Sequence, residues 1–155
     1  MIIKIAAAAV ATVAFALLFR TPSKYYIHCG IIGGMAWAVY DLLNTYTFFS
    51  PTEATFLAML LVSLVSRFCA VWEKCPVTVF LISGILPLVP GAGIYWTVYY
   101  LVTGQTSPAK DSGFEALKIT VAIVLGIVMV FELPQKLFRS PKKHKHAKDT
   151  DGGGV

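Results

Sequence analysis

Charged side chains are scarce in this sequence of 155 residues: they make up 14% of it, whereas 57% of the residues are hydrophobic. Soluble domains contain about 25% charged residues, so the composition indicates an integral membrane protein. The net charge of +5 does not indicate nucleic-acid binding, because six of the thirteen Lys and Arg residues lie after Leu133. We therefore expect contact with a lipid bilayer and no nucleic-acid partner.

The sequence also lacks the residue groupings on which enzymes and metal sites depend. Its three cysteines, Cys29, Cys69 and Cys75, are an odd number without a CxxC pair, which favours free thiols over a metal centre. No apolar segment contains a Ser/His/Asp or Cys/His grouping or an HExxH-like ligand set. We expect neither an enzyme nor a bound cofactor.

What the chain has instead is a series of long apolar segments separated by short polar turns. About 20 apolar residues in a helix cross the ~30 Å hydrocarbon core of a bilayer, so each segment is a candidate span. The predicted fold class is an all-α integral membrane protein with about five transmembrane helices. The predicted spans are residues 2–19, 25–47, 51–72, 76–104 and 113–133. They form one transmembrane domain over residues 1–134, and residues 135–155 are expected to be a basic, disordered, cytoplasmic tail.

The first apolar segment has some features of a signal peptide, since Lys4 precedes an apolar run. Its alanines come before its bulky residues, however, and the sequence up to Arg20 offers no small-residue cleavage site. We interpret this segment as a permanent helix. Its small residues 6–9, and the Gly30-x-x-x-Gly34 pattern in the second segment, are typical of close helix packing.

Two segments begin with a capping-box pattern, in which a serine is followed three residues later by a glutamate. Ser50 and Glu53 flank Pro51, a residue favoured in the first helical turn, and predict a helix start at residue 51. Ser112 and Glu115 predict a second start at about residue 113. Glu115 is also expected to pair with Lys118 on the helix surface.

Two charged residues lie inside or near the ends of predicted spans. Asp41 is the acidic residue placed well inside an apolar segment, and intramembrane carboxylates mark functional sites by default. It is therefore a candidate ion-coupling residue, with a hydrated, interfacial aspartate as the alternative. Arg67 lies near the end of the third span, and we expect its side chain to reach out to the lipid headgroups.

The fourth segment is interrupted in its middle by the sequence PLVPGAG, residues 87–93. An unbroken helix over residues 76–104 would be roughly 42 Å long, well over the ~30 Å hydrocarbon thickness. The two prolines remove backbone donors, and the glycines permit close backbone approach. Because unpaired backbone groups at membrane depth must face protein or a wet cavity, and transporters bind cargo at broken helices, the break predicts a solute site. A purely structural kink is the alternative.

The two half-helices around the break offer complementary polar ends. Carbonyls at the end of the first half suit an ammonium group, and N–H groups at the start of the second suit a carboxylate. A zwitterionic amino acid matches both ends, whereas a dicarboxylate matches one. Tyr95 lies one turn beyond the break and is expected to line it. The candidate substrate-binding residues are Ser83, Gly84, Leu86, Pro87, Pro90, Gly91, Gly93 and Tyr95.

These residues carry a family resemblance. Over roughly residues 10–133 the chain resembles the small-subunit type of the threonine/serine exporter family, above all in PVTVFLI at 76–82 leading into PLVPGAGIY at 87–95. The family pattern usually has proline where Ser83 stands and glycine where Ala92 stands. The resemblance implies export of threonine and serine driven by an ion gradient, or of succinate in some split systems, together with a second, larger membrane subunit. A non-transporting membrane scaffold or assembly protein is the rival class.

With five crossings, ten of the thirteen cations fall on one side of the membrane: Arg20, Lys24, Arg67, Lys74 and the six that follow Leu133. The positive-inside rule then places the N-terminus outside and the C-terminus in the cytoplasm of a cell (plasma) membrane protein. A re-entrant hairpin at residues 75–104 would put the basic tail outside, which the charge bias opposes.

Cysteine-accessibility labelling tests this orientation. In a chain without its three native cysteines, a single cysteine at Ser107 should react with an impermeant thiol reagent added outside the cell. A single cysteine at Ser140 should react only after the membrane is opened. External labelling at Ser140 would contradict the five-crossing topology.

Overall fold

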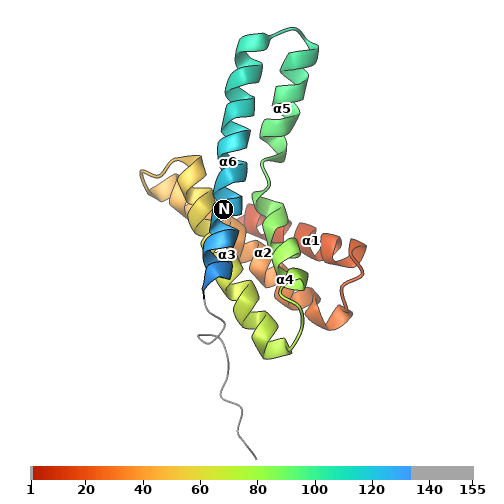
Figure 1. Cartoon of the computed structure of the whole chain (residues 1–155). Helices are drawn as coiled ribbons and strands as arrows, with labels where there is room; N and C mark the ends of the chain where they lie inside the picture. The colour runs from red at the N-terminus through yellow and green to blue at the C-terminus, as the bar shows by residue number, and fades with distance from the viewer. Residues whose placement is uncertain (1, 134–155) are drawn as a thin grey trace, which may run out of the picture.

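A computed structural model of the chain describes residues 2–133, and this part is helical with no strand (Figure 1). The elements are α1 (Ile2–Leu18), η1 (Ser23–Tyr25), α2 (Tyr26–Tyr46), α3 (Pro51–Glu73), α4 (Thr78–Ile85), η2 (Leu86–Leu88), α5 (Gly91–Val102) and α6 (Thr106–Glu132). The predicted all-α membrane fold is confirmed. The tail predicted for residues 135–155 lies outside the described residues.

Three helices are long and apolar enough to cross a membrane: α2 with the preceding η1 turn, α3 and α6. The α4–η2 and α5 helices meet at a bend of 50° and make a fourth span when they are taken together. Helix α1 has 17 residues and is about 25 Å long, shorter than the others. The structure thus has three to four candidate spans, and a fifth crossing by residues 2–19 stays a prediction.

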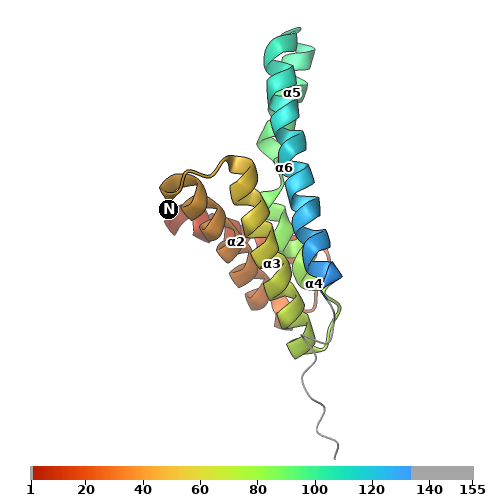
Figure 2. The ribbon, with the colours of Figure 1, turned by 60° about the vertical axis from the view of Figure 1, so that its left-hand side comes forward.

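Helices α1, α2 and α3 run in alternating directions, and α6 runs back along α5 (Figures 1 and 2). Helix α1 is antiparallel to α2, since Lys4 lies beside Asp41 and Thr12 beside Gly33. Helix α5 turns only 50° from α4, so it continues forward instead of folding back as a re-entrant hairpin would. The α5–α6 hairpin then projects beyond the ends of α1, α2 and α3 (Figure 2).

Glycines allow α1 and α2 to approach closely. A Cβ added at Gly33 would lie 1.9 Å from the Thr12 hydroxyl oxygen, and one at Gly30 would lie 3.0 Å from Val13. A Cβ at Gly34 would make an ordinary contact of 3.4 Å with Ala9. The small-residue patterns of both segments therefore serve helix packing, as the sequence predicts.

Helix α4 is held in the centre of the bundle by α2 and α3. Phe80 is fully buried, with its ring centroid 5.4 Å from that of Tyr25 in an edge-on arrangement. Gly84 leaves no room for a side chain, because an added Cβ would lie 2.8 Å from both Ile32 and Val62. This packing fixes the end of α4, and with it the position of the break.

Arg67 does not reach the headgroups, so that expectation is wrong. Its side chain is buried, at 7% exposure, and its guanidinium donates a hydrogen bond to the carbonyl of Val130 and lies 5.9 Å from the Phe131 ring. The last carbonyls of a helix have no partner within the helix. The Val130 carbonyl accepts from the Leu133 N–H at 3.2 Å, and Arg67, on the adjacent helix α3, supplies its second hydrogen bond.

The two capping-box patterns behave differently. At the start of α3 the Ser50 N–H donates to the Glu53 carboxylate at 2.8 Å, and the Glu53 N–H donates to the Ser50 hydroxyl at 3.4 Å, which confirms the prediction. Helix α6 begins at Thr106 instead of residue 113, after a turn in which Gly104 has a φ of +75°. Pro108 is tolerated there because it lies in the first helical turn. Ser112 is consequently inside the helix and caps nothing.

The α1–α2 packing predicts different effects of one substitution at two neighbouring positions. Gly33→Ala should lower the free energy of unfolding by about 1–3 kcal/mol, because the new methyl group overlaps Thr12. Gly34→Ala gains the same helix propensity without the overlap and should be neutral or stabilising. Thermal unfolding of the detergent-purified variants measures the difference, and equal melting temperatures would contradict the described packing.

Candidate functional site

The break is a short, defined piece of non-helical backbone. Helix α4 passes into the η2 turn, Val89 is extended with φ −60° and ψ 131°, and Pro90 has φ −76° and ψ 54°. These Pro90 angles are those of an inverse γ-turn, which the Gly91 N–H closes by donating to the Val89 carbonyl at 2.7 Å. The next N–H groups, at Ala92 and Gly93, lie in the first turn of α5 and have no helical acceptor, and no side chain caps them.

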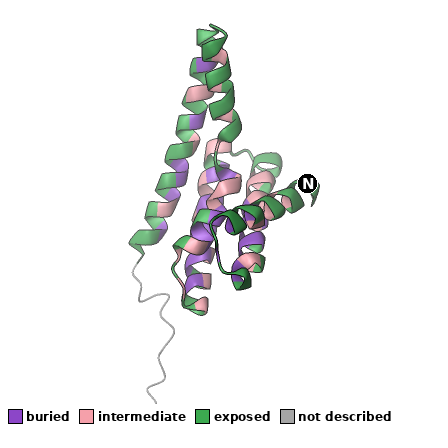
Figure 3. Ribbon diagram, turned by 90° about the vertical axis from the view of Figure 1, so that its right-hand side faces the viewer, coloured by how far each residue is buried: buried purple, intermediate pink, exposed green. Residues whose placement is uncertain are grey.

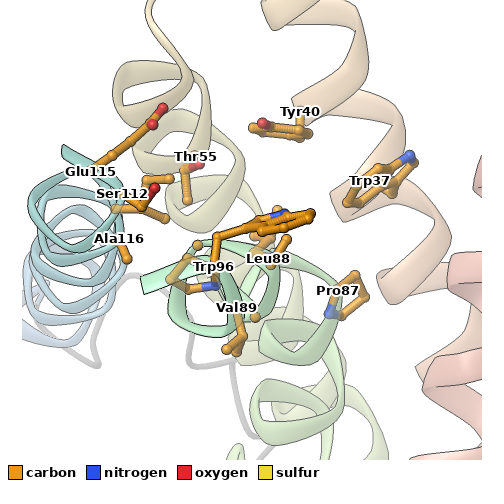
Figure 4. A pocket seen from close by; sticks show the side chains of 15 residues that line it. Trp37, Tyr40, Thr55, Pro87, Leu88, Val89, Trp96, Ser112, Glu115 and Ala116 are labelled. Carbon is orange, nitrogen blue, oxygen red and sulfur yellow. The ribbon is translucent and has the colours of Figure 1, made fainter. Parts of the chain in front are cut away.

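A cavity of about 350 Å³ lies beside this backbone (Figure 4). Its hydroxyl and carboxylate groups come from three helices: Tyr40 on α2, Thr55 on α3, and Ser112 and Glu115 on α6. The residues that line it are Trp37, Tyr40, Thr55, Pro87, Leu88, Val89, Pro90, Gly91, Ala92, Gly93, Trp96, Ser112, Glu115, Ala116 and Ile119. Its volume is in the range of ordinary small-molecule sites.

Four of the eight candidate substrate-binding residues, Pro87, Pro90, Gly91 and Gly93, line this cavity. Leu86 lines a neighbouring cavity of about 370 Å³ against α1 instead. The two cavities share Trp37 and Pro87, so these side chains form the wall between them.

The structure does not bring Ser83, Gly84 or Tyr95 to the cavity. Ser83 is buried, and its hydroxyl donates to the Val79 carbonyl of its own helix at 3.1 Å. Gly84 packs against Ile32 and Val62. Tyr95 is 61% exposed on the outer face of α5, where its ring stacks on that of Tyr99.

Asp41, the candidate ion-coupling residue, also lies elsewhere. Its carboxylate is 3.6 Å from the ammonium group of Lys4, and its side chain is 15% exposed. It does not line the cavity at the break. The carboxylate that lines the cavity is Glu115.

Sequence reasoning missed the polar residues that α2, α3 and α6 contribute to the cavity. Tyr40 and Thr55 gave no local signal, because their position depends on how the helices pack. Ser112 and Glu115 gave a misleading one: they stand three residues apart, and this spacing places both on one face of α6. No ion pair forms within residues 2–133 between Glu115 and Lys118, whose ammonium group instead lies 4.8 Å from the Phe114 ring.

The two glycines at the start of α5 have different surroundings. A Cβ added at Gly91 would meet nothing within 4 Å, so this position opens onto free space in the cavity. A Cβ added at Gly93 would lie 3.1 Å from the Cβ of Ala116, so Gly93 also serves the close packing of α5 on α6. A larger residue at Gly91 fills the cavity, whereas one at Gly93 also pushes the two helices apart.

The arrangement offers groups that can bind a small molecule. Backbone N–H donors lie at one place in its wall, a carboxylate at another, and the indole rings of Trp37 and Trp96 form apolar parts of the lining (Figure 4). Residues 2–133 contain no group of three or more His, Cys, Asp or Glu residues placed to hold a metal ion. The cavity is suited to a small molecule that carries charged groups.

Comparison with known families identifies the family of the chain. The family model described as Threonine/Serine exporter, ThrE, matches residues 4–132, a stretch that contains all six helices except the first two residues of α1. The chain belongs to the threonine/serine exporter family. This exporter family is a family of membrane transporters and not an enzyme class, so the chain is a multi-pass membrane protein of the exporter type. No solved structure matches this exporter chain.

The cavity of this exporter should contain water, because the Ala92 and Gly93 N–H groups in its lining have no helical acceptor and no side-chain cap. In a chain without native cysteines, Ser112→Cys should react with a small water-soluble thiol reagent, whereas Ala122→Cys, buried on the same helix, should not. Adding Gly91→Leu should slow the Ser112→Cys reaction by filling the space. An unreactive Ser112→Cys in correctly inserted protein would show that the cavity is closed to water.

Proposed function

We propose that the chain is the membrane subunit of a secondary transporter that exports threonine and serine, and that the cavity at the break is its solute site. The observation that supports this most is the cavity itself. It joins uncapped N–H groups of α5 to a carboxylate and hydroxyl groups from α2, α3 and α6, at the point where the membrane helix is interrupted. Broken helices are where secondary transporters hold small polar cargo.

Threonine and serine fit the chemistry of this lining. The α5 N-terminus offers N–H donors and the positive end of its dipole to the solute carboxylate. Tyr40, Thr55 and Ser112 supply hydroxyl groups near the solute side chain, although the Thr55 hydroxyl already donates to the Pro51 carbonyl at 2.7 Å. A dicarboxylate such as succinate finds one matching end here and is the weaker candidate.

A second, larger membrane subunit of the same family is proposed to complete the site. Helix α5 has no buried residue and packs mainly on α6, so its outer face is uncovered (Figure 3). Backbone that is broken at membrane depth must be screened from lipid or open to water. The large exposed side chains of α5 are Ile94, Tyr95, Trp96, Val98, Tyr99, Leu101 and Val102.

The proposed orientation in the plasma membrane has the N-terminus outside and the C-terminus in the cytoplasm. The turns after α2 and α5 then lie outside, and the α3–α4 turn and the end of α6 lie inside. The charge bias of the sequence supports this arrangement.

Efflux of radiolabelled threonine tests the function. Cells that express the chain with its partner subunit should export threonine, and Gly91→Leu should reduce export at least tenfold because the side chain occupies the cavity. Gly91→Ala adds one methyl group at the same position and should retain most of the activity. The amount of inserted protein is measured for each variant.

Two results would contradict the proposal. If correctly inserted Gly91→Leu protein exports threonine at the parental rate, the solute site lies elsewhere. The break would then have a purely structural role. Robust export by the purified chain alone in liposomes would show that no second subunit is needed.

A further inference from the structure

Glu115 lies where two hollows of the molecule meet. One is the cavity at the break, and the other is a broad open cleft between the first turns of α3 and α6. The cleft is lined by Ser50, Pro51, Thr52, Glu53, Ala109, Lys110, Asp111, Gly113, Phe114, Glu115, Leu117 and Lys118. Glu115 is the one residue common to the two linings, so a solute that passes between the cleft and the cavity passes this carboxylate.

Among residues 2–133, the carboxylates of Asp41 and Glu53 are already engaged, and that of Glu115 is not. Asp41 is 3.6 Å from Lys4, and Glu53 accepts hydrogen bonds from the N–H and hydroxyl of Ser50 at 2.8 Å and 3.0 Å. Glu115 makes no ion pair with any described residue, and it is the only carboxylate in the described lining of the cavity. Its negative charge is available to a solute.

The helix that carries Glu115 is in direct contact with the start of α5. Gly93 packs directly on Ala116, with 3.1 Å between an added Cβ and the Ala116 Cβ, and Ala116 follows Glu115 in the chain. The N–H donors of Ala92 and Gly93 and the carboxylate of Glu115 thus belong to the lining of one cavity, where α5 and α6 meet. An α-amino acid carries its carboxylate and ammonium on one carbon atom, so it can engage both groups at once.

We propose that the Glu115 carboxylate binds the ammonium group of the exported amino acid, while the N–H groups at the start of α5 bind its carboxylate. This inference rests on the proposed function and names the group that selects amino acids over dicarboxylates. A dicarboxylate would bring its second negative charge next to Glu115, where like charges repel. The carbonyls of Ser83, Gly84 and Leu86 are not needed for the ammonium, since none of these residues lines the cavity.

Glu115→Gln tests the assignment, because it keeps the shape of the side chain and removes its charge. With the partner subunit present, it should lower threonine export at least tenfold, as expected for loss of a charge-assisted bond. Succinate added as a competitor should inhibit the variant more strongly than the parental protein. Glu115→Asp should recover part of the threonine export, because it keeps the charge.

Asp111→Asn is the matched control, since Asp111 lies one turn earlier on α6 and lines the cleft but not the cavity. It should export threonine at the parental rate. Equal rates for Glu115→Gln and Asp111→Asn, at equal amounts of inserted protein, would overturn the assignment and leave the exporter function standing. If the parental chain with its partner exports no threonine, the proposed function fails, and this inference fails with it.

Discussion

The constraint on which the rest of the structure depends is that backbone polar groups within a membrane need partners. Pro87 and Pro90 remove two N–H donors from one apolar segment, so the segment cannot continue as a single helix. The chain passes through the η2 turn and a γ-turn at Pro90 instead. The next residues of α5, Ala92 and Gly93, whose N–H groups have no helical acceptor, line a cavity. The cavity proposed as the solute site follows from this interruption and from the helices packed around it.

The surrounding bundle holds the break in place by close packing of small residues. Because Gly33 has no side chain, Thr12 of α1 packs directly against α2. In the same way, Gly84 allows Ile32 and Val62 to pack against α4. Gly93 brings α5 against α6. Gly91 differs from all of these, since its missing side chain leaves space in the cavity. Glycines that look alike in the sequence thus divide into those that serve packing and one that keeps the cavity open.

Much of the fold could be predicted from the sequence, because its signals are local. The apolar lengths and the Ser50–Glu53 box placed the start of α3 correctly, and the prolines placed the break. The start of α6 was placed seven residues late, since the polar residues from Thr106 form helix turns beyond the bundle instead of a loop. Arg67 was misplaced because its acceptor, the Val130 carbonyl, is 63 residues away in the chain. Local patterns do not show which distant helix will lie alongside.

The candidate site could be predicted in part for the same reason. The break was evident, but the groups opposite it come from α2, α3 and α6, and their convergence depends on tertiary packing. Tyr95 was expected at the site from its distance along the chain, yet the helix turns it outward onto Tyr99. Ser112 and Glu115 matched a helix-start pattern and were therefore not considered as cavity residues.

The most direct measurement of the central claim is a density map of the chain bound to its partner subunit in the presence of threonine. The account predicts density for the amino acid in the cavity, with its carboxylate at the Ala92 and Gly93 N–H groups of α5. Threonine density away from residues 87–93, with the cavity filled by protein or lipid, would contradict it.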